Sequence, residues 1–102
     1  MSGLLNKIIA DGTVQLAATV PAGISFAALN ILAANDTSSD ATVRIWITLD
    51  PTPNQVDLVE PGVVVASKGR YEDSVRIASP SENVFIQATP GVVVRVENVV
   101  EA

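Results

Sequence analysis

Turn signals recur about every eight to twelve residues along this chain and leave only short segments between them. They are Asp11-Gly12, Pro21-Ala22-Gly23, the polar run 35–40, the proline-rich run 50–54, Pro61-Gly62, Ser67-Lys68-Gly69, the run 79–82 and Thr89-Pro90-Gly91. Connections of about three to six residues cannot hold the crossover helices that join parallel strands. The spacing therefore predicts short antiparallel strands.

The segments between the turns alternate with the period of two that a half-buried strand requires. The clearest is 42–49, where every second residue is aliphatic and is predicted to form a core row: Val43, Ile45, Ile47 and Leu49. The opposite row contains Trp46, the only tryptophan of the chain, among Thr42, Arg44 and Thr48. In 70–78, Tyr71, Asp73, Val75 and Ile77 form one row and a charged row lies opposite.

The remaining predicted strands are 13–20, 25–33, 55–60, 63–66, 83–88 and 92–99. Residues 4–10 are ambiguous, because their apolar residues would share one helical face yet also suit an edge strand, and we favour a strand or extended arm. The prediction is an all-β fold, an antiparallel β-sandwich or jelly-roll-like domain of about eight short strands. Residues 1–10 would be an N-terminal arm or edge strand, and residues 11–102 the β-sandwich domain.

Composition limits the core and the partners. Of 102 residues, 48% are apolar but only 4% are aromatic, so the core must be aliphatic and small. A small two-layer core leaves a marginal stability that oligomerisation or docking would raise. The net charge is −5 and the basic residues are dispersed, which argues against a nucleic-acid partner. We expect no membrane partner, because the sequence has neither a secretory leader nor a long apolar span.

The chain lacks the side chains used by most enzymes. With no histidine and no cysteine, the usual general base, thiol nucleophile and zinc ligands are missing. The carboxylates that could form a catalytic pair lie in or beside turns, where such groups ordinarily stabilise the turn: Asp36, Asp40, Asp50, Asp57, Glu60, Asp73 and Glu82. We therefore expect no enzymatic activity and no cofactor. Asp36 and Asp40 are weak candidates for a hard-cation site, although their spacing matches no defined calcium loop.

Trp46 allows two interpretations. It can cover the margin of the sandwich within the monomer, or it can anchor an interface, because Trp, Tyr and Arg are enriched at binding hot spots. Phe85 is similarly ambiguous, since only one row of 83–88 can face inward. Tyr71 is interpreted as a core-edge residue. The candidate interface residues are Leu4, Leu5, Ile8 and Ile9 of the N-terminal segment, together with Trp46 and Phe85.

Most of the chain resembles a family of small virion proteins of tailed bacteriophages. In the C-terminal half the resembling pattern is a Pro-Gly turn with a valine run, then 68–72 (Lys-Gly-Arg-Tyr-Glu), 81–88 (Ser-Glu-Asn-Val-Phe-Ile-Gln-Ala) and 92–96 (Val-Val-Val-Arg-Val). In the N-terminal half it is 13–23, Leu29-Asn30-Ile31 and 41–45 (Ala-Thr-Val-Arg-Ile). The resemblance implies a non-enzymatic β-sandwich displayed on a phage particle.

The expected function follows from these observations together. It is that of a virion structural protein, a capsid decoration (cement or knob) protein at the particle surface that binds the major capsid protein or another virion protein. We expect a homo-oligomer. The alternative is a tail- or fibre-associated carbohydrate- or receptor-binding module, in which Trp46 stacks on a sugar and Asp36 or Asp40 acts through calcium.

Overall fold

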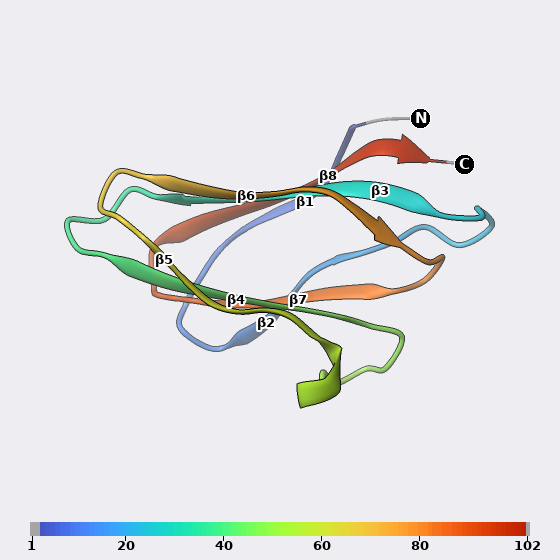
Figure 1. Cartoon of the computed structure of the whole chain (residues 1–102), viewed down its shortest axis with the longest axis horizontal. Helices are drawn as coiled ribbons and strands as arrows, with labels where there is room; N and C mark the ends of the chain where they lie inside the picture. Colours follow the sequence, from blue (N-terminus) through green and yellow to red (C-terminus); the bar gives the residue numbers. More distant parts are fainter. Residues whose placement is uncertain (1–2, 102) are drawn as a thin grey trace.

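The predicted strands form two antiparallel sheets that pack face to face (Figure 1). This computed structural model describes the backbone of residues 3–101, and the side chains of all of these except Val75, Val100 and Glu101. The elements are β1 (Gly3–Ile9), β2 (Val14–Thr19), β3 (Ala27–Asn35), β4 (Ala41–Thr48), the single 3₁₀ turn η1 (Gln55–Asp57), β5 (Leu58–Val65), β6 (Arg70–Ala78), β7 (Asn83–Ala88) and β8 (Val92–Glu101).

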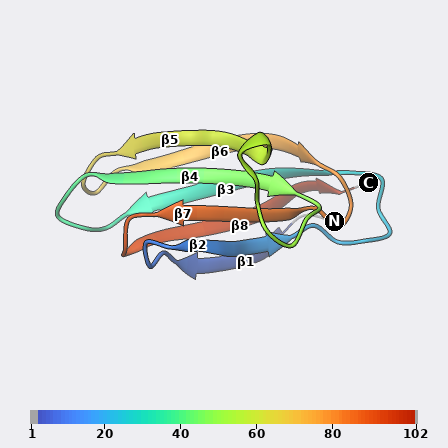
Figure 2. The same ribbon diagram turned by 90° about the horizontal axis from the view of Figure 1, so that it is seen from below.

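Sheet A has the strand order β1-β8-β3-β6, and sheet B has the order β2-β7-β4-β5. Except between β4 and β5, each strand is followed along the chain by one in the other sheet, as both views show (Figures 1 and 2). Eight antiparallel strands wound between two sheets in this order make a jelly roll. The predicted fold class is confirmed.

The core lies between the two sheets and is aliphatic, as the composition predicts. Its largest fully buried side chains are Leu29, Ile31, Ile45 and Ile86, followed by a set of valines. β8 contributes Val92, Val94 and Val96 to the core. The two sheets therefore meet through branched aliphatic residues, which suit a pleated surface.

The predicted core row of β4 is correct in part. Val43 and Ile45 are fully buried, and Ile47 packs partly buried against the core. The prediction for Leu49 is wrong, because β4 ends at Thr48 and Leu49 is exposed in the following loop.

Bulges overturn two further predictions. Pro61-Gly62 is not a turn: β5 continues through it, and these two residues stand opposite the single Arg44 of β4. An edge strand tolerates a proline at such a bulge, because the missing donor need not break a central ladder. Ile77 does not share the inner row of Tyr71, because a shift in the β3–β6 register moves it to the outer face. The Val75 side chain, predicted in the same row, lies outside the described residues.

The N-terminal segment is a strand of the sandwich. β1 forms an edge of sheet A and pairs with β8; residues 1 and 2 of the predicted segment lie outside the described residues. Residues 55–60, predicted as a short strand, divide into η1 and the beginning of β5. At one end of the sandwich the β3–β4 and β5–β6 loops meet, while the β4–β5 loop lies at the other end (Figure 2).

Candidate functional site

The two outer faces of the sandwich differ in charge. Cross-strand register places the following charged residues on the outer face of sheet A: Lys7, Arg70, Glu72, Arg95 and Glu97. On the outer face of sheet B, Arg44 is the only charged residue among the described strand residues. Because the cores of protein interfaces are depleted in charge, sheet B has the face better suited to a protein partner.

An apolar row crosses the outer face of sheet B. Leu16, Phe85, Trp46 and Leu58 are cross-strand neighbours on β2, β7, β4 and β5. Trp46 and Phe85 are each only 8% exposed, so their rings are covered within the monomer. The exposed apolar residues of this face are instead Val14 and Leu16 on β2 and Val64 on β5.

The β4–β5 loop, residues 49–57, covers part of this face. η1 projects from the outer side of sheet B (Figure 1), and seen from below, the loop crosses in front of the strands (Figure 2). Pro53, Asn54 and Gln55 line a hollow together with Trp46 and Leu58. The loop is held by a cap, because the Asn54 N–H donates to Asp57 Oδ2 at 2.9 Å. Trp46 thus lies beneath a structured loop.

Arg44 lies over Trp46. Its guanidinium carbon is 5.4 Å from the ring centroid, and its Nε donates to the carbonyl of Pro61 at 3.0 Å. Arg44 forms no ion pair with any side chain in the described part of the chain. This cation is therefore held by an aromatic face and a carbonyl dipole but has no carboxylate to balance it.

β1 presents a second apolar surface on the other sheet. Leu5 and Ile8 pack partly buried against the core, whereas Leu4 and Ile9 are exposed. Ile9 stands opposite Val93 of β8, and the two line a shallow hollow with Lys7 and Ile8. Of the four predicted interface residues on this strand, Leu4 and Ile9 are thus available to a partner.

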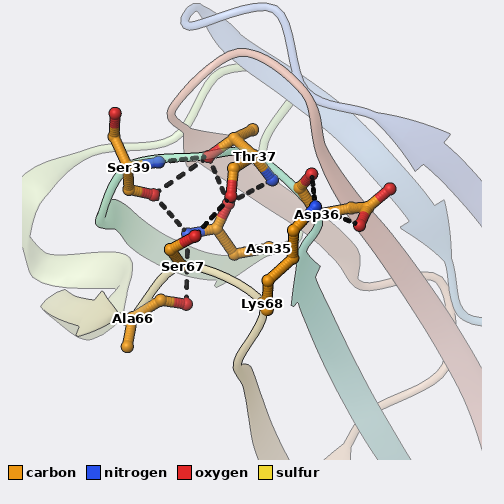
Figure 3. Close-up of polar contacts among 7 residues, drawn as sticks. All are labelled: Asn35, Asp36, Thr37, Ser39, Ala66, Ser67 and Lys68. Atoms are coloured by element: carbon orange, nitrogen blue, oxygen red, sulfur yellow. Dashed lines mark hydrogen bonds and ion pairs between the residues drawn. The ribbon is translucent and has the colours of Figure 1, made fainter.

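Asn35 joins two loops at one end of the sandwich (Figure 3). Its buried amide nitrogen lies 2.8, 3.0 and 3.2 Å from the carbonyls of Ser39, Val65 and Ala66. Its Oδ1 accepts from the Thr37 backbone N–H and hydroxyl. Two backbone hydrogen bonds add to the network: the Asn35 N–H donates to the Gly69 carbonyl, and the Lys68 N–H donates to the Asn35 carbonyl. The network ties the β3–β4 loop to the β5–β6 loop.

The cation-site candidates Asp36 and Asp40 lie beside this network and are not brought together into a ligand set. Lys68 Nζ is 2.9 Å from Asp36 Oδ1, so an ammonium already balances that carboxylate (Figure 3). Asp40 Oδ1 accepts from the Ser67 N–H at 3.4 Å. Within residues 3–101, no group of three or more His, Cys, Asp or Glu side chains is placed to hold a metal ion.

Two further carboxylates, Asp11 and Glu82, have local structural partners. Asp11 accepts from both the backbone and the hydroxyl of Thr13, and these hydrogen bonds, the hydroxyl first, lower the pKa of Asp11. Glu82 accepts from the Ser79 N–H at 2.7 Å. Both contacts stabilise turns.

At the open margin between β5 and β6, the Tyr71 hydroxyl donates to Glu60 Oε1 at 3.3 Å, and Asp73 pairs with Arg76 at 2.9 Å. Burial, followed by the negative charges of Asp73 and Glu60, raises the pKa of Tyr71. Tyr71 also packs partly buried against the core. Its position is therefore at the edge of the core.

Sequence reasoning missed Val14, Leu16 and Val64 as surface residues. In β2 a bulge between Leu16 and Ala18 turns Val14 and Leu16 outward while Ala17 and Ala18 are buried. Strict alternation would have placed Leu16 and Ala18 on one face. In the sequence, only the low charge of β2 could have indicated this exposed apolar surface.

A scan against protein-family models finds no match to the chain, and searches of the curated proteins and of the solved structures find none either. No helix in residues 3–101 has the length and apolar character needed to cross a membrane.

Proposed function

We propose that this chain is a non-enzymatic structural protein of a tailed-bacteriophage particle, a capsid decoration protein at the virion surface. It binds the capsid lattice or a neighbouring virion protein and reinforces it. The observation that carries the proposal is the presence of two separate apolar surfaces on one small sandwich: Leu4 and Ile9 on β1, and Val14, Leu16 and Val64 on sheet B.

Two contact surfaces on one small domain suit a protein that links neighbours in an assembly. A contact that is weak alone becomes effective when a second contact of the same molecule is made, and linkage can raise overall binding about 10²- to 10⁴-fold. A shell protein that binds in many copies also stabilises the form to which it binds. The resemblance to small phage virion proteins and the use of jelly rolls in viral capsids support this role.

The carbohydrate-binding alternative requires an accessible aromatic face. Trp46 is covered by Arg44 and shares its hollow with the β4–β5 loop, so the stacking surface that this alternative assigns to Trp46 is not open. The decoration role is the better supported of the two.

Mass spectrometry of purified particles tests the proposal, because it predicts that the chain is recovered in many copies per particle. A variant that weakens the β1 surface, Ile9→Asp, should reduce the number of copies retained after washing. The matched control is Leu49→Asp, which alters an equally exposed residue in the β4–β5 loop. Particles without the chain, or equal losses from both variants, would overturn the proposal.

A further inference from the structure

We propose that the outer face of sheet B binds a second copy of this chain, face to face about a twofold axis. In this arrangement Arg44 of each protomer pairs with the carboxylates of the partner's β4–β5 loop. This inference goes beyond the proposed function and does not depend on it.

The edges of the sandwich are poorly suited to self-association. Each of the four edge strands contains a bulge or irregular register: β1 near Leu5, β2 near Ala17, β5 at Pro61-Gly62 and β6 opposite Asn30. Such irregularities twist an edge and interrupt the row of backbone groups that another strand would need. Association by strand addition is therefore disfavoured.

The outer face of sheet A is also less suitable, because burying it would desolvate several charged side chains, including the Arg95–Glu97 pair. On sheet B only Arg44 would be desolvated among the described strand residues. Two copies with a net charge of −5 each repel one another, and a nearly uncharged face is where they can approach at least cost.

Charge complementarity identifies the second copy as the occupant. The face has one cation, Arg44, without a carboxylate partner in the described part of the chain. The loop that projects from the same face contains Asp50 and Asp57 and no basic residue. A twofold axis that lies in the plane of the interface, perpendicular to the strands, lays each loop across the partner's sheet, where its carboxylates meet the partner's Arg44.

The shape of the face fits the same arrangement. Val56, on the projecting η1, is 92% exposed. Towards the opposite end of the strands, Gly12, Thr42 and Pro90 line a hollow of about 260 Å³ on the same face. The twofold arrangement directs Val56 of each copy towards this hollow in the other.

The area of the face is that of a small, weak interface. Four strands about 4.8 Å apart and about six residues long give a flat area of roughly 400 Å² per copy. Two such faces, extended by the two clasping loops, approach the roughly 1,000 Å² that a specific interface needs. We therefore expect a dimer that forms in the micromolar range and dissociates on dilution.

Sedimentation equilibrium between about 1 µM and about 1 mM tests the proposal. The wild-type mass should rise with concentration from 10.6 kDa to twice that value. Leu16→Glu should raise the dissociation constant at least about tenfold. Ile77→Glu is the matched control, since Ile77 is 61% exposed on sheet A and Leu16 is 49% exposed on sheet B. A monomer at every concentration, or equal weakening by both variants, would refute the proposal.

A charge exchange tests the pairing. Arg44→Glu should weaken the dimer, and adding Asp50→Lys should restore it, since the Asp50 side chain is not part of the cap that holds the loop. Arg44→Gln should reduce the dependence of the dissociation constant on salt, which keeps the test informative if Arg44→Glu does not fold. Failure of both the rescue and the salt effect would eliminate the Arg44 pairing.

Discussion

Replacement of Trp46 by alanine should destabilise the monomer, because the ring is 8% exposed and lies between Phe85, Leu58 and the β4–β5 loop. An aromatic side chain buries about 150 to 250 Å², which at about 25 cal/mol per Å² corresponds to roughly 4 to 6 kcal/mol of transfer free energy. Truncation of a buried Phe or Trp to alanine typically costs about 3 to 5 kcal/mol. The contact with Arg44, worth about 0.5 to 1 kcal/mol, is included in this cost.

We therefore expect Trp46→Ala to lower the free energy of unfolding by about 3 to 5 kcal/mol, from a total of about 5 to 15 kcal/mol for a domain of this size. The assay is urea unfolding followed by far-ultraviolet circular dichroism, because the variant lacks the only tryptophan. It should be run at a protein concentration well below the dissociation constant of the proposed dimer, so that self-association does not contribute. With a denaturant slope of about 2 kcal/mol/M, the midpoint should fall by about 2 M.

Val56→Ala is the control, since this residue lies on the same loop but is exposed, and its effect should stay within about 0.5 kcal/mol. A loss below about 1 kcal/mol for Trp46→Ala would show that the loop and Arg44 do not hold the ring in the monomer. Trp46 would then not be a covered residue of the monomer.

Three further perturbations follow from the local geometry. Asn35→Ala should lower the free energy of unfolding by about 2 to 4 kcal/mol, because several hydrogen bonds of about 0.5 to 1.5 kcal/mol each are lost. Asn35→Asp should lower it further, since a carboxylate would then face three carbonyl oxygens. Denaturation and amide exchange of residues 36–40 measure this, and unchanged exchange would contradict it. The raised pKa of Tyr71 means that its stabilisation is fully present below about pH 10 and is lost as the pH rises through the folded-state value. Tyr71→Phe should remove that alkaline loss in denaturation curves, and tyrosinate absorbance reports the pKa directly because the chain has one tyrosine. Gly91→Ala should cost about 1 to 3 kcal/mol, because Gly91 has φ +94° and a Cβ would lie 3.0 Å from Thr37 Cγ2; a thermal midpoint equal to wild type would contradict this.

The strands could be predicted because their causes are local. Turn residues mark where the chain reverses, and alternation marks which segments have one buried face, so β6 and β7 agree with the predicted ranges 70–78 and 83–88. Bulges could not be predicted, because the extra residue is selected by the partner strand. One inserted residue reverses the facing of every side chain beyond it, which explains the errors at Ile77 and at β2.

The candidate site was predictable only in part for the same reason. Alternation correctly directs Trp46 away from the core between the sheets, but its cover comes from a loop whose path depends on tertiary contacts. Asn35 was recognised as part of a polar loop, whereas its bonds to Val65 and Ala66 join segments distant in sequence. The uncharged face of sheet B becomes visible only when β2, β7, β4 and β5 are placed side by side.

A cryo-electron microscopy map of the assembled phage particle would show where the chain lies in the virion. The proposed decoration role predicts density for a two-layer sandwich of this size at the particle surface, repeated over the lattice, with β1 towards the lattice. Particles that contain the chain only inside the shell, or not at all, would contradict it.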